Sequence, residues 1–191
     1  MNQSELCALM ENQVLEAIRK RRSVVKFDST AVEEQKTTAI LEAARWAPSW
    51  INRQPWKFIV IKDQATKDKL SQVVPTLFSK SLQEAPLSIA VAVNQEEDPY
   101  HFVEAGAIAM QNMALAAESL GLHTGWLGIF DVKNKKDSTE NMVKRILNLP
   151  KPYRVISLLP VGYASVENSV PQRKDLDEMV FYDKFGNTKQ A

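Results

Sequence analysis

RWAPSWINRQPW, residues 45–56, is the stretch around which the rest of the chain is organised, because it connects a predicted helix to a predicted strand. Pro48 and Pro55 hold their own φ near about −65° and bias the residue before each toward extended backbone. Ser49 and Asn52 are therefore presented on a stiff connection, which suits a planar ligand with hydrogen-bonding edges. The alternative is a turn in which these side chains satisfy local backbone groups while the tryptophans pack. Both interpretations are open at this point.

Hydrophobic periodicity predicts helices and buried strands on both sides of this stretch. Thr30 and Glu33 have the spacing of a capping box, Asp63 and either Asp137 or Ser138 are placed to begin helices, and Gly121 is placed to end one. The strands at 56–61, 87–93 and 154–161 are nearly all apolar, so we expect both of their faces to be covered. Helices are predicted over residues 5–20, 32–47, 63–74, 76–83, 100–120 and 137–147, a short strand over 124–127, and an edge strand over 179–182. Together these elements predict one α+β domain spanning 1–191, with a central sheet flanked by helices.

Composition narrows the class of protein. The chain has 191 residues, of which 45% are hydrophobic and 25% charged, and its formal net charge is +1. With so small a net charge, the protein has no overall positive potential that would attract a nucleic acid or an anionic membrane, so neither is expected as a partner. The lone Cys7 excludes an internal disulfide and fits a reducing compartment. The longest apolar run is too short to span a bilayer and the first twenty residues lack a signal-peptide pattern, so we expect a cytoplasmic protein.

The sequence lacks the usual motifs for nucleotide binding, metal binding and nucleophilic catalysis. The six glycines form neither a Gly-x-Gly-x-x-Gly nor a Walker loop. His101 and His123 have no metal-type partner three or four residues away, and no Ser-His-Asp or Cys-His set is evident. If the protein is an enzyme, we therefore expect a cofactor to carry the chemistry, no side chain to act as a catalytic acid or base, and no metal site.

Two further patterns are open to two interpretations each. The basic run 19–22, followed by Ser23, is either a solvated face or a cradle in which arginine and a hydroxyl bind a phosphate. The helix 100–120 is rich in glycine and alanine, so it packs closely either inside the domain or against a copy of itself across a two-fold axis.

In combination, Arg21-Arg22-Ser23, the loop of residues 47–56 and the segment Gly125-Trp126-Leu127-Gly128 resemble the nitroreductase family of FMN-dependent oxidoreductases. The resemblance extends from residue 17 to about residue 182. It implies a nitroreductase-like α+β fold with a mostly antiparallel sheet. It also implies an intertwined homodimer that binds one FMN at each end of its interface.

The resemblance also implies roles for individual residues. Arg21, Arg22 and Ser23 match the positions that hold the ribityl chain and phosphate of FMN, and Arg173, with Lys174 as a weaker candidate, matches a C-terminal basic residue on the same phosphate. In the family, the loop that reaches the flavin comes from the partner subunit. Its matching residues are Pro48, Ser49 and Asn52, and the backbone donors to flavin N5 and O4 match Leu127 and Gly128.

Two of the cofactor-site positions depart from the family pattern. Val25 stands where a second basic residue is common, so one phosphate contact is either missing or supplied by Lys26. Trp50 stands where small residues are common, as does its neighbour Ile51, and both would narrow the pocket above the flavin.

The expected activity is hydride transfer from NADPH or NADH to flavin N5 and then to an electron-poor acceptor such as a nitroaromatic or a quinone, in a ping-pong cycle. Two alternatives stay open. One is a specialised member of the family that oxidises or dehalogenates an organic substrate or consumes its own flavin. The other is a flavin-binding protein without turnover, its pocket blocked by Trp50.

Overall fold

A five-stranded sheet forms the centre of the computed structural model, which describes residues 12–75, 78–166 and 169–188. The strands follow the order β1-β2-β5-β3, and β4 pairs with β5 beside β3. All four strand pairings are antiparallel, which confirms the predicted sheet. The strands are β1 (Trp56–Ile61), β2 (Leu87–Asn94), β3 (His123–Thr124), β4 (Leu127–Gly128) and β5 (Tyr153–Gly162).

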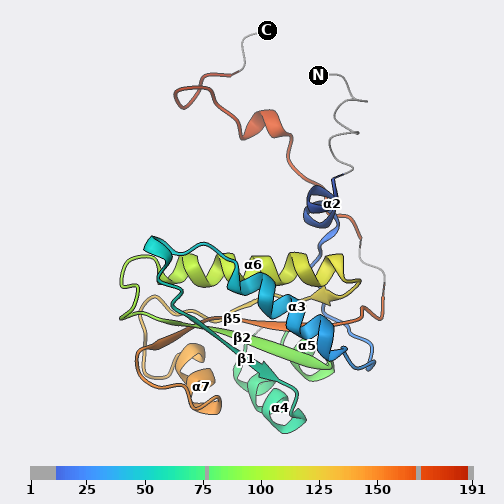
Figure 1. Cartoon of the computed structure of the whole chain (residues 1–191), viewed down its shortest axis with the longest axis vertical. Helices are drawn as coiled ribbons and strands as arrows, with labels where there is room; N and C mark the ends of the chain where they lie inside the picture. Colours follow the sequence, from blue (N-terminus) through green and yellow to red (C-terminus); the bar gives the residue numbers. More distant parts are fainter. Residues whose placement is uncertain (1–11, 76–77, 167–168, 189–191) are drawn as a thin grey trace.

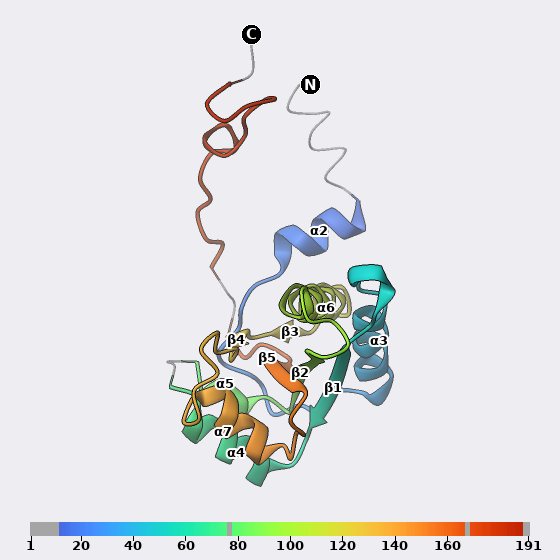
Figure 2. The same cartoon turned by 90° about the vertical axis from the view of Figure 1, so that its left-hand side faces the viewer.

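Helices cover the two faces of this sheet (Figure 2). On one face α3 (Glu34–Arg45) and α6 (Phe102–Ser119) pack over a core that includes Ile40, Met113 and Leu159. The other face is covered by α4 (Gln64–Val73), α5 (Lys80–Glu84) and α7 (Thr139–Ile146). A further helix, α2 (Gln13–Lys20), lies outside the layers, close to the C-terminal end of α6 (Figure 1). These three layers confirm the α+β class.

The middle strands are buried as predicted, but the first is not. Seven of the eight residues of β2 and nine of the ten of β5 are buried. In β1, by contrast, Lys57 is exposed and Phe58, Ile59 and Val60 are only half-buried. The expectation of two covered faces for residues 56–61 is wrong there, because β1 ends the strand order and, within the described residues, pairs with a strand on one side only.

The small side chains of α6 serve close packing on the sheet. A Cβ added to Gly106 would lie 2.5 Å from Cγ1 of Ile156 on β5. Only glycine permits this approach of the helix to the strand. The chain turns back toward the sheet directly afterwards, because Gly121 adopts φ 73° just past the C-cap Leu120.

Local capping signals predicted two helix starts correctly and one incorrectly. The side chains of Asp63 and Ser138 accept backbone hydrogen bonds at the starts of α4 and α7. The capping box of Thr30 and Glu33 is wrong, because the Thr30 hydroxyl donates to Asp28 instead, at 2.5 Å. Glu33 is itself the N-cap residue, without a side-chain cap, and its carboxylate accepts from the Tyr163 hydroxyl.

Other boundaries also differ from the sequence prediction. The predicted strand 124–127 is two short strands, because Gly125 and Trp126 interrupt the pairing with β5. The edge strand at 179–182 is wrong: that stretch follows the short 3-10 helix η2 (Leu176–Glu178) and belongs to no strand. The helix predicted at 5–20 is observed over Gln13–Lys20 as α2, and the one predicted at 76–83 is observed over Lys80–Glu84 as α5. Residues 1–11 and 76–77 lie outside the described parts of the chain.

Candidate flavin site

The basic run 21–23 follows α2 directly and is held against the sheet. Ser23 forms a parallel bridge with Thr124 of β3, and the amide of Val24 donates to the Thr124 carbonyl at 2.9 Å. Val24 is fully buried, whereas Ser23 is exposed and Arg21 and Val25 are half-buried. The run therefore passes along the sheet edge with Ser23 exposed and Arg21 half-buried.

The guanidinium of Arg22 is already partly hydrogen-bonded to backbone carbonyls of the residues just before it. Its Nη1 donates to the carbonyls of Arg19 at 2.7 Å, Lys20 at 3.1 Å and Arg21 at 2.8 Å, at the C-terminal end of α2. Its Nε is buried and has no hydrogen-bond partner. A buried donor without an acceptor is costly, so this nitrogen is suited to an incoming anionic oxygen.

The segment 125–128 lies on the same edge, a few residues beyond the bridge. Leu127 and Gly128 pair with Leu158 and Ser157 of β5. Gly128 is exposed, and the atom nearest to a Cβ built on it is Cζ2 of Trp126 at 3.9 Å. The structure thus brings the basic run and this open backbone edge together through β3 and β4.

The loop 48–55 has a strained backbone that proline spacing alone does not predict. Its middle forms the 3-10 turn η1 (Trp50–Asn52). Ile51, Asn52 and Gln54 adopt φ of 48°, 56° and 51°, in the left-handed region that disfavours β-branched residues such as isoleucine. The Ser49 hydroxyl accepts from the amide of Gln54 at 2.9 Å and closes the turn. Strain of this kind is concentrated at functional sites.

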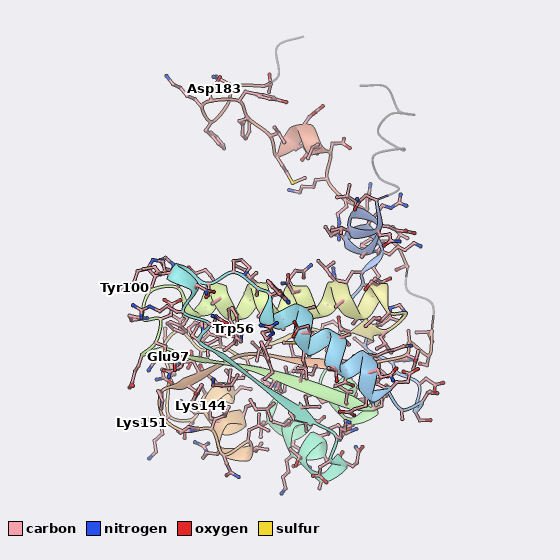
Figure 3. The ribbon with its side chains drawn as sticks, in the orientation of Figure 1. Trp56, Glu97, Tyr100, Lys144, Lys151 and Asp183 are labelled. Atoms are coloured by element: carbon pink, nitrogen blue, oxygen red, sulfur yellow. The ribbon has the colours of Figure 1, made fainter. Side chains whose placement is uncertain are left out.

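A single chain does not bring this loop to the basic run. Trp50 packs on Tyr100 and His101, just before the N-terminal end of α6, whereas Ser23 is bridged to Thr124 after its C-terminal end. The 18 residues of α6 make it about 27 Å long. Figures 1 and 3 show the turn and Tyr100 at one end of α6 and α2 near the other.

A groove of about 260 Å³ opens beside the loop. We call it the tryptophan groove; it is lined by Pro48, Ser49, Trp50, His101, Glu104, Ala105 and Ile108. The α6 residues of this set were missed by sequence reasoning. Their spacing of three and four residues along one helix face was the signal that could have identified them.

Arg173 and Lys174 lie in the C-terminal stretch, away from both parts of the site. Residues 169–188 extend away from the sheet, on the same side as α2 (Figures 1 and 2), and Asp183 is labelled near their far end in Figure 3. Both basic side chains are exposed, and so are apolar ones such as Leu176, at 71%, and Phe185, at 92%. The single chain thus places neither basic residue beside residues 21–23.

A buried ion pair supports the segment that follows Gly128. On β5, Arg154 donates from Nε to Oε1 of Glu140 at 2.6 Å and from Nη2 to the carbonyl of Asp131 at 2.7 Å. The Glu140 carboxylate also accepts from the amides of Asp131 and Val155. The backbone amide of Lys135 donates to Asp131 and lowers the pKa of that carboxyl below its ordinary value. Sequence reasoning missed this pair, although Arg154 begins an otherwise apolar predicted strand.

In residues 12–75, 78–166 and 169–188 no group of three or more potential metal ligands comes together. No helix in those ranges is long and apolar enough to cross a membrane.

Comparison with known proteins returned one family and close structural matches. The model described as "Nitroreductase family" matches residues 18–88 and 75–163. A curated protein of Methanothermobacter thermautotrophicus, named "Putative NADH dehydrogenase/NAD(P)H nitroreductase", is 34% identical over 85% of this chain and 82% of its own length. An "FMN-dependent Nitroreductase" structure from Clostridium difficile R20291 superposes with a TM-score of 0.80, at 29% identity, over 88% of this chain and 98% of the other. A structure from Desulfovibrio desulfuricans, titled as a nitroreductase "in complex with fmn", reaches a TM-score of 0.76 at 30% identity over 91% and 98% of the two chains.

Proposed function

Because this chain belongs to the nitroreductase family, we propose that it is an FMN-dependent oxidoreductase that moves hydride from NADH or NADPH to an electron-poor small molecule. Nitroaromatics and quinones are the expected acceptors, reduced in a ping-pong cycle. We assign residues 1–191 to one flavin-binding domain that works in the cytoplasm, which agrees with the lone cysteine.

One observation carries the proposal. The Ser23–Thr124 bridge sets two arginines and a hydroxyl on the same sheet edge as the open backbone of Gly128. FMN has a dianionic phosphate at one end and a hydrogen-bonding ring edge at the other, so it needs charge-assisted donors and an exposed backbone amide within one site. The unpartnered Nε of Arg22 and the space beside Gly128 fit such a ligand.

In this arrangement Arg21, Arg22 and Ser23 bind the phosphate and ribityl chain, and Val25 lines the same end. The exposed backbone amide of Gly128 donates to the ring edge and orients it, and Leu127, paired with β5, holds that backbone in place. FMN held there would supply the hydride-accepting position, N5, between the nicotinamide and the acceptor. The side chains of this chain serve to bind, orient and exclude water.

The remaining residues of the site come from a second copy of the chain. Pro48, Ser49, Trp50 and Asn52 lie at the far end of α6, and Arg173 and Lys174 lie in the outlying tail, so a homodimer is needed to complete each site. Exposed apolar groups support this assembly: Val14 is 63% exposed and Ile18 50% on α2. An apolar groove of about 320 Å³ opens beside Val14, between α2, α3 and α6. A second copy would cover these surfaces, as well as the apolar side chains of the tail.

The visible spectrum of the purified protein tests the proposal. We expect a yellow protein that holds one FMN per chain, loses its flavin absorbance when NADH or NADPH is added without oxygen, and recovers it with a quinone. Parallel double-reciprocal plots are expected for the ping-pong cycle. A colourless protein that stays free of flavin after incubation with FMN would contradict the proposal, and so would bound flavin that neither nucleotide reduces.

A further inference from the structure

The tryptophan groove combines Pro48 and Ser49, two of the proposed flavin contacts, with residues of α6 that no part of the proposed function uses. Its volume of about 260 Å³ is slightly below the range of roughly 300–1,000 Å³ that small-molecule sites usually have. A molecule bound there would lie next to the flavin edge that Pro48 and Ser49 are proposed to contact. The groove is therefore placed, and sized, for a small acceptor.

Its walls are mostly apolar, and Trp50 is held in place from several sides. The indole meets the ring of Tyr100 edge-on at a centroid distance of 5.6 Å and the ring of His101 at 6.0 Å. The guanidinium of Arg53 lies 5.8 Å from the indole centroid. Ile108, 39% exposed, is the large aliphatic side chain of the lining. A rigid indole and an aliphatic side chain in one narrow groove suit a single flat ring.

Glu104 gives this groove a negative charge. Among the described residues that line it, Glu104 is the one with an acidic side chain, and that side chain is 63% exposed. The nearest basic lining group is Nδ1 of His101, 3.6 Å from Oε1 of Glu104, which is longer than a hydrogen bond. The other charged groups nearby do not line the groove: Arg53 lies over Trp50, and Asp98 accepts from the amide of His101.

We propose that the tryptophan groove selects small single-ring acceptors that carry a cationic or hydrogen-bond-donating substituent. The ring lies between Trp50 and Ile108, and the substituent meets the carboxylate of Glu104. This inference rests on the proposed function and assigns its acceptor class. It makes Trp50 and Glu104 the residues that determine which acceptors enter, one by shape and the other by charge.

Two probes of the same ring and opposite charge test the assignment, para-nitrobenzyl-trimethylammonium and para-nitrobenzoate. Their dissociation constants are measured by calorimetry on the FMN-loaded, oxidised protein without reductant, so that binding is separated from turnover. We expect the cation to bind about fivefold more tightly, in line with one exposed charge pair. Glu104→Gln should bring the ratio close to one, and about 0.5 M salt should reduce it in the wild type.

Glu118→Gln is the matched control. Glu118 also lies on α6, and its Oε2 is 3.4 Å from Nδ1 of His123, but it is at the opposite end of the helix and does not line the groove. Its substitution should leave the ratio unchanged. An equal or reversed preference in the wild type, a preference that survives in Glu104→Gln, or failure of both probes to bind would overturn the inference. A protein that binds FMN and is reduced by NADH but shows such a result disproves the acceptor class alone, whereas a protein that never binds FMN disproves the proposed function.

Discussion

The carbonyl oxygen of Val24 lies 2.8 Å from the position that a Cβ on Gly125 would occupy. The two backbones approach this closely because Val24 also donates its amide to Thr124, so the chain after α2 is pressed against the start of the segment 125–128. The absence of a side chain at Gly125 is thus what allows the proposed phosphate-binding run and the proposed ring-binding edge to be neighbours.

Gly125→Ala is expected to separate these segments. The new methyl group would contact backbone that has little freedom to move, which costs about 1–3 kcal/mol for an overpacked interior. We expect a lower unfolding temperature together with weaker FMN binding, measured by thermal unfolding and by fluorescence titration with FMN. Unchanged values of both would show that the contact does not hold the site together.

Gly128→Ala should weaken FMN binding without lowering the unfolding temperature. A Cβ there meets no atom closer than 3.9 Å, and its backbone is not left-handed, so the unfolding temperature should stay at the wild-type value. The methyl group would instead occupy space beside the amide proposed to bind the flavin edge, and FMN affinity should fall. The same two measurements apply, and a loss of stability without a loss of FMN affinity would remove Gly128 from the site.

Arg21→Ala should weaken FMN retention. A charge-assisted hydrogen bond contributes about 1.5–3 kcal/mol, so we expect an affinity loss of at least about tenfold, measured by equilibrium dialysis. Lys20→Ala is the control, because it removes the same charge from the neighbouring residue, whose ammonium pairs with Glu16 at 2.6 Å. Equal losses of FMN affinity in the two variants would mean that the total positive charge of the run matters and that Arg21 makes no specific contact.

Trp50→Ala should broaden the range of acceptors. Removing the indole opens one wall of the tryptophan groove, so the kcat/KM for a two-ring quinone should rise by about tenfold relative to that for a one-ring quinone. Trp46→Ala is the matched control, because that indole is 73% exposed and donates to Glu42 instead of lining the groove. Identical selectivity in Trp50→Ala and wild type would show that Trp50 only packs.

Arg154→Met should be strongly destabilising. The substitution leaves the carboxylate of Glu140, which is 0% exposed, without its cationic partner, and breaking a buried pair costs about 3–5 kcal/mol. Adding Glu140→Leu should recover only part of this loss, because the amides of Asp131 and Val155 also lose their acceptor. Urea unfolding measures the free energy of unfolding of the single and the double variant. A value for Arg154→Met within about 1 kcal/mol of the wild type would contradict the expectation.

Acid should weaken the hydrogen bonds at the end of α3, the helix that leads into the loop 48–55. Hydrogen bonds from Arg45, and then from Trp46, lower the pKa of Glu42 from its ordinary 4.5 to about 2. Because the folded protein holds this proton less tightly than the unfolded chain, the contribution is complete above pH 4.5 and is lost as the pH falls through about 2. The unfolding temperature of Glu42→Gln should therefore depend less on pH across this window, and salt should narrow the difference, since the group is exposed. Parallel curves for the two proteins would contradict the assignment.

Local interactions explain why much of the fold could be predicted from sequence. Apolar periodicity placed β2, β5 and α6 to within two residues at each end. Short polar side chains predicted helix starts at Asp63 and at either Asp137 or Ser138, and the structure has Ser138 as the cap. The combination of basic run, proline loop and glycine edge was enough to indicate the family. The same local reasoning failed at Thr30, where a second acceptor, Asp28, competes for the hydroxyl.

Tertiary structure decided how the candidate site is divided. Sequence could suggest that the loop 48–55 is stiff, but not that its residues take left-handed backbone, nor that α6 separates it from residues 21–23. It could not pair Arg154 with Glu140, or bring His101 and Glu104 beside Trp50. These arrangements depend on contacts between segments far apart in the chain. The sequence by itself determined most of the helices and the long strands, because their periodicity and caps involve residues only a few positions apart.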